Sequence, residues 1–265
     1  MGIAHERMLF ILLKITEACS MGCSHCMNDA KPDGEHMTFE TFQAVIDFII
    51  KHRAYQHIII SGGEPTEHPV FPMFMGYAIA ALNEIKEPKL LTITTNGFWV
   101  LDNISCAKEL VAAGNEYTLI RFQVSTDTRY YPKKLDVTKR IWREDGFILC
   151  KDCVEYMYPQ GRAKTNNFPW QAKASKCFNV RAITKQLPNP TIENVVGGLF
   201  SAMKFCTPAI RIDGGISLGE SDLCPKVASI YDKEEDIIQK IKDFKCNGCY
   251  PLNENLPMMY KQFVS

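Results

Sequence analysis

Short apolar runs rich in β-branched residues alternate with amphipathic stretches between residue 8 and about residue 160. Such runs are typical of buried strands, and apolar positions spaced three and four residues apart are typical of helices packed on a sheet. Strands are predicted at Met8–Thr16, Ile58–Ser61, Leu90–Thr95, Tyr117–Ser125 and within Phe147–Tyr158, and helices at Thr38–Ile50, Phe71–Ile85, Ile104–Ala113 and Val137–Arg143. This alternation predicts an α/β fold with a parallel sheet.

The pattern changes in the last third of the chain. A loop is predicted through residue 180, Ala209–Leu218 predicts a β-hairpin, and Glu234–Phe244 predicts an amphipathic helix. The hairpin is expected to turn at Asp213, Gly214 and Gly215. We therefore expect a main domain at residues 1–180 and a small α+β extension at residues 181–265.

Composition narrows the classes of function. The chain has 265 residues, of which 46% are hydrophobic and 23% charged, as in a soluble globular enzyme. Thirty basic and thirty acidic residues cancel, so no long-range field favours a nucleic acid or an anionic membrane. The first apolar run is too short to span a bilayer and is broken by Lys14. We expect a cytoplasmic protein with neither nucleic acid nor membrane as a partner.

Three cysteines follow the first predicted strand with the spacing C-x-x-x-C-x-x-C, at Cys19, Cys23 and Cys26. Three thiolates spaced in this way can surround one face of a cuboidal iron–sulfur cluster and leave the fourth iron without a protein ligand. The alternative is a zinc knuckle, but zinc sites favour C-x-x-C pairs closed by a fourth ligand. The spacing therefore favours an iron–sulfur cluster with one open iron.

The segment that contains these three cysteines resembles the radical S-adenosylmethionine (radical SAM) superfamily. In that family SAM chelates the open iron of a [4Fe-4S] cluster and is cleaved to methionine and a 5′-deoxyadenosyl radical. The resemblance implies a partial (β/α) barrel of about five to six parallel strands. Gly62, Gly63 and Glu64 after the second strand resemble the family's G-G-E-P loop, which binds the amino group of SAM. Further SAM contacts are implied for the strand-end residues Asn96, Ser125 and Asp127, and for His25 between two of the cysteines.

A second group of cysteines lies in the extension, at Cys206, Cys224, Cys246 and Cys249. It resembles the twitch form of the SPASM domain, which holds one auxiliary [4Fe-4S] cluster. Four thiolates would close the coordination of that cluster, which suits electron transfer or structural support. A four-cysteine zinc site is the alternative.

The other cysteines and one arginine are ambiguous. Cys150, Cys153 and Cys177 are candidates for a third metal site, or one of them for a thiol donor of a hydrogen atom, although free cysteines are more often simply buried. Arg162, in a Pro-Gln-Gly-Arg-Ala stretch, is expected to pair with a carboxylate either in a binding role or in a structural salt bridge.

The resemblance implies an enzyme that abstracts a hydrogen atom from carbon of a peptide or small-molecule substrate, with a reductant such as flavodoxin or ferredoxin. Three subclasses stay open: an alcohol dehydrogenase, a peptide epimerase or cross-linking maturase, and an activase of a glycyl-radical enzyme. The activase is disfavoured because activases typically carry extra cysteines soon after the first motif, and no cysteine lies between Cys26 and Cys106 here. Outside enzymes, the alternative is a zinc-binding interaction module.

Overall fold

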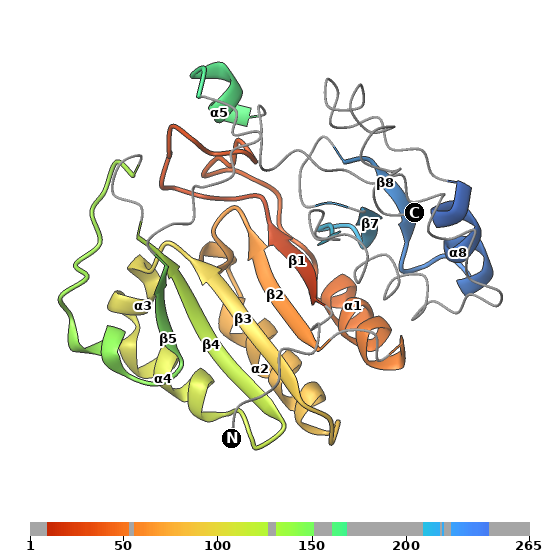
Figure 1. Cartoon of the computed structure of the whole chain (residues 1–265), viewed down its shortest axis with the longest axis horizontal. Helices are drawn as coiled ribbons and strands as arrows, with labels where there is room; N and C mark the ends of the chain where they lie inside the picture. Colours follow the sequence, from red (N-terminus) through yellow and green to blue (C-terminus); the bar gives the residue numbers. More distant parts are fainter. Residues whose placement is uncertain are drawn as a thin grey trace, which may run out of the picture.

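The computed structural model describes residues 10–52, 56–126, 131–150, 161–168, 209–217, 219 and 224–243. Its centre is an eight-stranded sheet in the order β5-β4-β3-β2-β1-β6-β7-β8 (Figure 1). The strands are β1 (Phe10–Thr16), β2 (His57–Gly62), β3 (Lys89–Thr95), β4 (Thr118–Ser125), β5 (Phe147–Cys150), β6 (Ala209–Ile210), β7 (Gly215–Ser217) and β8 (Lys226–Ser229). The α-helices are α1 (Phe39–His52), α2 (Phe71–Asn83), α3 (Phe98–Asp102), α4 (Ile104–Ala112), α5 (Gly161–Thr165) and α8 (Glu234–Asp243), and the 3-10 helices are η1 (Pro65–Glu67) and η2 (Arg140–Arg143).

The strands β1 to β6 form the parallel part of the sheet. Parallel ladders join β1 to β2, β2 to β3, β3 to β4 and β4 to β5, and a further parallel ladder joins β6 to β1. The predicted α/β partial barrel with five to six parallel strands is confirmed. The hairpin of β6 and β7, which the sequence assigns to the extension, pairs with β1 through Ala209 and Ile210 and so continues the main sheet.

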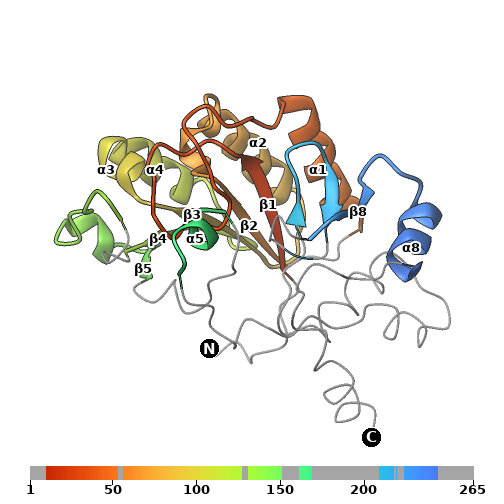
Figure 2. The ribbon, with the colours of Figure 1, turned by 90° about the horizontal axis from the view of Figure 1, so that it is seen from above.

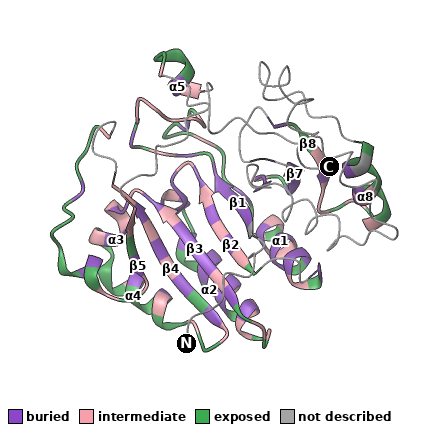
Figure 3. Ribbon diagram, in the orientation of Figure 1, coloured by how far each residue is buried: buried purple, intermediate pink, exposed green. Residues whose placement is uncertain are grey.

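The helices α1 to α4 cover one face of this sheet, as the view from above shows (Figure 2). Alternate residues of β1, namely Ile11, Leu13 and Ile15, face those helices and are at most 1% exposed. Between α1 and α2, the rings of Phe42 and Phe74 stack with their centroids 4.2 Å apart. Buried positions accordingly follow the middle strands and the inner sides of the helices (Figure 3).

Local sequence signals explain several element ends. Thr38 caps α1, since its hydroxyl accepts a hydrogen bond from the Thr41 amide at 3.2 Å and its carbonyl accepts one from the Phe42 amide at 3.0 Å. Gly97, between β3 and α3, has φ of +86°, and a Cβ there would lie 2.6 Å from a methyl of Val124. Glycine is therefore required at that turn.

Some elements differ from the sequence prediction. The helix predicted at Val137–Arg143 is only the short η2, because Asp136 caps a turn at Thr138, whose amide and hydroxyl lie 3.0 and 2.6 Å from its carboxylate. Helices α3 and α5 and strand β8 were not predicted. Each has five residues or fewer, too few for a periodic pattern to stand out. Within the described ranges, no helix is long and apolar enough to cross a membrane.

Candidate functional site

The predicted site segments meet at one edge of the sheet. Strands β1, β2, β3 and β4 end at Thr16, Gly62, Thr95 and Ser125, and Thr16 lies opposite Gly62 in the ladder. Because these strands are parallel, the loops that follow them leave from the same edge, where barrel enzymes place their catalytic loops. The structure therefore brings three segments together. They are the loop of residues 17–38 between β1 and α1 (the cysteine loop), the loop of residues 62–64 after β2 (the glycine loop), and Asn96.

The three cysteines of the first motif lie on the loop between β1 and α1. Cys19, Cys23 and Cys26 are partly exposed and carry free thiols. Burial raises the pKa of Cys19 to about 11 and that of Cys23 to about 12. Repulsion from Glu64 and Glu67 adds to the rise at Cys19, and repulsion from the other two thiolates adds to the rise at Cys23. Binding of iron would have to displace these protons, since the thiolate is the ligand.

This donor set fits an iron–sulfur cluster. Among the described residues, no group of three or more His, Cys, Asp or Glu side chains is placed to hold a metal ion. A cluster spreads its thiolates over separate iron atoms, so its ligands need not converge on one point as the ligands of a zinc ion do. Three soft thiolates on one accessible loop suit iron and sulfide.

The glycine loop after β2 is bonded directly to the cysteine loop. The Gly63 amide donates to the Thr16 carbonyl at 2.8 Å, and the Glu64 amide donates to the Ala18 carbonyl at 2.7 Å. A Cβ on Gly62 would lie 2.1 Å from the Thr16 oxygen, and one on Gly63 would lie 2.2 Å from the Ala18 oxygen. Only glycine allows this approach, so the two loops are held in one fixed relation.

Glu64 is buried between the ends of β2 and β3, with an exposed fraction of 3%. Its carboxylate accepts hydrogen bonds from the hydroxyls of Thr66 and Thr95, both at 2.6 Å, and from the Asn96 amide at 2.7 Å. Burial raises the pKa of Glu64, while these hydrogen bonds act in the opposite direction. The sequence predicted a contact to an ammonium group for this carboxylate, and the structure adds that it ties β2 to β3.

Four further residues of the site were not singled out from the sequence. The buried Lys14 ammonium donates to the Asn28 side-chain oxygen at 3.0 Å, and the Asn28 amide nitrogen donates to the Gly62 carbonyl at 3.1 Å. The amide and hydroxyl of Ser20 both donate to the Glu67 carboxylate at 2.8 Å. Lys14 interrupts an apolar strand, and this was the one signal that the sequence offered.

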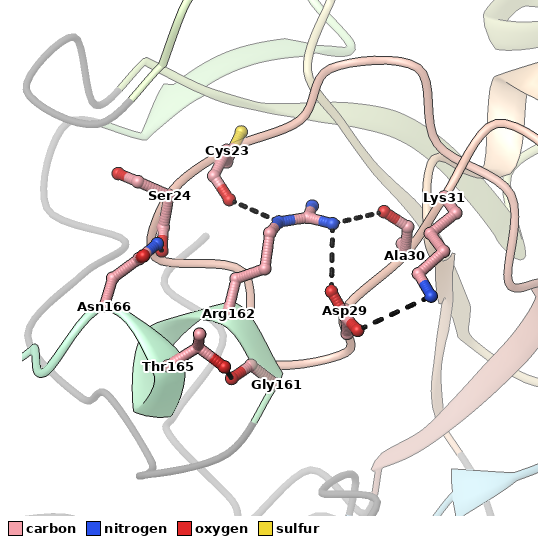
Figure 4. Close-up of polar contacts among 9 residues, drawn as sticks. All are labelled: Cys23, Ser24, Asp29, Ala30, Lys31, Gly161, Arg162, Thr165 and Asn166. Atoms are coloured by element: carbon pink, nitrogen blue, oxygen red, sulfur yellow. Dashed lines mark hydrogen bonds and ion pairs between the residues drawn. The ribbon is translucent and has the colours of Figure 1, made fainter.

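Helix α5 lies against the other side of the cysteine loop (Figure 4). Arg162 donates from Nε to the Cys23 carbonyl at 2.9 Å and from Nη1 to the Ala30 carbonyl at 2.8 Å. The same Nη1 lies 3.1 Å from Asp29 Oδ1. The carboxylate partner expected for Arg162 is therefore Asp29, and the arginine also binds the main chain of the cysteine loop.

The main chain and side chains of α5 add to these contacts. The Ala163 amide donates to the Cys26 carbonyl at 3.2 Å, and the Asn166 side chain donates to the Ser24 carbonyl at 2.8 Å. Gly161 has φ of +53°, and a Cβ there would lie 2.6 Å from a carbonyl oxygen of the cysteine loop. The loop is thus held from two sides, by the glycine loop and by α5.

The remaining predicted contacts are only partly within the described residues. The His25 ring stacks on Tyr131 with centroids 5.7 Å apart, and Ser125 is partly buried at the end of β4 opposite Cys150. Cys150 takes part in a disulfide, so a role as thiol donor would require its reduction first. Three predicted residues, Asp127, Cys153 and Cys177, lie outside the described residues.

Of the second cysteine group, Cys224 alone is described. It is buried beside Arg211, which donates to its carbonyl at 3.2 Å and to the Ser217 hydroxyl at 3.1 Å. Cys206, Cys246 and Cys249 lie outside the described residues, so the auxiliary cluster stays a prediction.

The face of the sheet turned away from α1 to α4 carries polar side chains. On it, Thr92 shares its hydroxyl with the Arg121 Nε at 2.9 Å and with the His57 Nε2 at 2.8 Å. Burial, with the positive charge of Arg121, lowers the pKa of His57 to about 4. This face therefore presents a cation and a neutral imidazole below the strand ends.

Comparison with protein families decides the class of the molecule. The sequence model of the radical SAM superfamily matches residues 13–158, more than half of the chain. The chain belongs to the radical SAM superfamily. Membership supports SAM-dependent radical chemistry and implies a [4Fe-4S] cluster and SAM as cofactors.

A curated relative supports this membership over a short stretch. The chain is 31% identical over 96 residues to the "Putative L-lysine 2,3-aminomutase" of Aquifex aeolicus (strain VF5). This match covers 36% of the chain and 25% of the relative, so the chain spans about a quarter of that protein.

Solved radical SAM structures share the fold. BtrN in complex with AdoMet and 2-DOIA aligns over 98% of this chain and 91% of its own, with a TM-score of 0.57 and 12% identity. SuiB of Streptococcus suis bound to the precursor peptide SuiA aligns over 89% and 67%, with a TM-score of 0.53 and 14% identity. The complex of anSMEcpe with AdoMet and the Cp18Cys peptide aligns over 90% and 81%, with a TM-score of 0.51 and 15% identity. At these identities the likeness is one of fold.

Proposed function

We propose that the chain binds a [4Fe-4S] cluster through Cys19, Cys23 and Cys26 and abstracts a hydrogen atom from carbon of a peptide or small-molecule substrate. The observation that carries the proposal is the direct main-chain bonding of the glycine loop to the cysteine loop, through Gly63 and Glu64. It supports the proposal because the loop that we predict to bind SAM is then bonded next to the segment of the three cysteines, at the edge where barrel enzymes place their catalytic loops. When bound, the cluster and SAM supply the radical that removes the hydrogen atom.

The chain's own residues would position these groups. The Gly62 carbonyl, oriented by Asn28, and the carboxylate of Glu64 are acceptors suited to the ammonium group of SAM. His25, Asn96, Ser125 and Asp127 are the further proposed contacts, from loops that leave the same edge. Holding the reactants in one geometry matters because an unpositioned primary radical would react with whatever it met.

The substrate would lie below this edge, on the polar face of the sheet. Three fold neighbours support a peptide or a small molecule, since they were solved with 2-DOIA, with the precursor peptide SuiA and with the Cp18Cys peptide. We further propose an auxiliary [4Fe-4S] cluster on Cys206, Cys224, Cys246 and Cys249 that handles electrons after hydrogen abstraction, and an external reductant such as flavodoxin or ferredoxin.

Anaerobic reconstitution with iron and sulfide tests the first cluster. The wild-type protein should bind iron and sulfide in equal amounts, turn brown, and cleave SAM when dithionite is added. Replacing Cys19, Cys23 or Cys26 by Ala should lower the iron content by one cluster and abolish SAM cleavage. Cys106→Ala, on α4 away from the strand ends, should leave both unchanged. Stoichiometric zinc uptake with no SAM-cleaving form would refute the enzyme and support the zinc-binding module.

The auxiliary cluster is tested separately with Cys206→Ala. If that cluster acts after hydrogen abstraction, the variant should still cleave SAM but form no product from substrate. Loss of SAM cleavage in a folded variant would contradict this order of events.

Incorporation of solvent deuterium into a peptide substrate distinguishes an epimerase with a thiol donor from a dehydrogenase. An epimerase should incorporate deuterium and lose this activity when its thiol donor is replaced in Cys153→Ala or Cys177→Ala, whereas a dehydrogenase should incorporate none.

A further inference from the structure

Arg162 and Asp29 form an ion pair on the side of the cysteine loop that packs against α5 (Figure 4). We infer that this pair sets the reduction potential of the cluster bound to that loop, and that Arg162 also positions the loop for ligation. The inference rests on the proposed role of Cys19, Cys23 and Cys26 as cluster ligands. It assigns to Arg162 a positioning role, since its contacts are with carbonyls and with Asp29.

The guanidinium of Arg162 binds the loop through two of its nitrogens at once, an arrangement called the Arg162 fork below. Nε is bonded to the carbonyl of Cys23, and Nη1 is shared between the Ala30 carbonyl and the Asp29 carboxylate. The side chain is 23% exposed, against 46% for Asp29. A planar guanidinium can hold three acceptors in fixed directions, whereas the ammonium of a lysine cannot match this geometry.

The loop needs such support because its backbone is unusual. Asp29 has φ of +47°, in the left-handed region that non-glycine residues rarely adopt. Such a conformation persists where surrounding contacts over-determine it. The Arg162 fork and the bonds from Ala163 and Asn166 to the same loop provide those contacts.

The charges of the pair act on the cluster in opposite directions. Reduction adds one electron to a cluster that already carries thiolate charge, so a nearby cation favours the reduced form and a nearby anion opposes it. Arg162 is hydrogen-bonded to the carbonyl of a proposed ligand, Cys23, and Asp29 lies three residues after another, Cys26. Outer-sphere charges and hydrogen bonds of this kind tune metal centres.

Two variants with opposite charge changes test the inference. Arg162→Gln removes one of the two cations paired with Asp29 and leaves Lys31, whose Nζ lies 3.9 Å from Asp29 Oδ2 (Figure 4). This loss of positive charge should lower the midpoint potential of the cluster. Asp29→Asn leaves the Arg162 cation unbalanced and should raise it, and Asn suits the left-handed backbone at this position. The midpoint is measured on the reconstituted protein by a dithionite titration followed by electron paramagnetic resonance, without SAM or substrate, so the result is independent of turnover.

Two further variants separate charge from geometry. Lys164→Gln removes the same charge from an exposed position of α5 and should leave the potential unchanged. Arg162→Lys keeps the charge but loses the fork, so the potential should stay near that of the wild type. Amide hydrogen exchange in residues 19–30 of the reconstituted protein should be faster in both Arg162 variants than in Lys164→Gln.

The outcomes distinguish this inference from the proposed function. Failure of the wild-type protein to assemble a cluster refutes the proposed function itself. If the cluster assembles but Arg162→Gln and Asp29→Asn shift the potential in the same direction, or leave it unchanged, the electrostatic role is wrong while the cluster assignment stands. If exchange in residues 19–30 is unchanged in Arg162→Lys, the positioning role is wrong.

Discussion

The carboxylate of Glu64 accepts a hydrogen bond from the hydroxyl of Thr95 at 2.6 Å. This bond joins the loop after β2 to the end of β3, and the Thr95 hydroxyl in turn accepts a bond from the Gly97 amide at 3.1 Å. Glu64 is therefore as much a structural residue as a candidate ligand for SAM. The two roles are separable because stability can be measured without SAM.

Replacing Glu64 by Gln should destabilise the protein before any SAM is added. The carboxylate faces donors only, so the amide nitrogen of a glutamine would meet another donor, and one buried donor would lose its partner. We expect a loss of about 1–3 kcal/mol in the free energy of unfolding, measured by urea denaturation. Glu84→Gln, at an exposed position, is the control and should change it by less than about 0.5 kcal/mol. Equal stabilities of the two variants would contradict the structural role.

Two glycines of the chain should respond in opposite ways to the same methyl group. Gly63→Ala places a Cβ 2.2 Å from the Ala18 oxygen and must push the glycine loop away from the cysteine loop. We expect it to cost about 1–3 kcal/mol in stability and to abolish SAM cleavage. Gly76 lies within α2 with nothing within 4 Å of its Cβ position, so Gly76→Ala should stabilise the protein by about 0.5–1 kcal/mol. Thermal and urea unfolding of the two variants check both signs.

The strands and their chemistry could be predicted because they are encoded locally. The apolar runs fixed the positions of β1 to β4, and the spacing of Cys19, Cys23 and Cys26 placed three thiols on one loop. The capping role of Thr38 was also predictable, since its partners Thr41 and Phe42 are within four residues.

What supports the site could not be predicted, because it depends on contacts between distant parts of the chain. Arg162 and Cys23 are separated by 139 residues, and Glu67 and Ser20 by 47. No periodic pattern records such pairs, and α5 is too short to produce one. Asn28 has polar partners on β1 and after β2 only once the sheet has formed. Pairing of β6 with β1 depends likewise on tertiary packing, because a two-residue strand carries almost no signal of its own.

Asn28 offers a test of whether the Gly62 carbonyl is an acceptor for SAM. Asn28→Asp keeps an acceptor for Lys14 but puts a negative oxygen where the amide donated to that carbonyl. Repulsion from that oxygen should turn the Gly62 carbonyl out of its position, and loss of this aligned acceptor, worth about 0.5–1.5 kcal/mol, should weaken SAM binding by roughly threefold to tenfold. The KM for SAM should rise in reductive cleavage, with little change in kcat. Asn83→Asp, at the far end of α2, makes the same chemical change and should leave KM unaltered. A fall in kcat alone would show that Asn28 does not act through SAM binding.

The pH dependence of stability should identify His57 as a partly buried, neutral imidazole. Arg121 Nε donates to the Thr92 hydroxyl, and His57 Nε2 lies 2.8 Å from the same hydroxyl, so protonation of His57 would put a second positive charge next to Arg121. The pKa of His57 is lowered from 6.5 to about 4 in the folded protein. Its contribution to stability is therefore complete above about pH 6.5 and is lost as the pH falls from there toward 4.

Replacing His57 by Gln keeps a polar partner for Thr92 but removes the titration. Urea unfolding at several pH values between about 7.5 and 4.5 should show a stability advantage of the wild type that shrinks as the pH falls. Glu64 and the other buried groups are common to both proteins, so their titration cancels in this difference. Arg121→Gln retains His57 but removes the neighbouring cation, which should raise the pKa of His57 and weaken the pH dependence. A difference between wild type and His57→Gln that is constant with pH would mean that folding leaves the pKa of His57 unshifted, and the neutral imidazole beside Arg121 would be wrong.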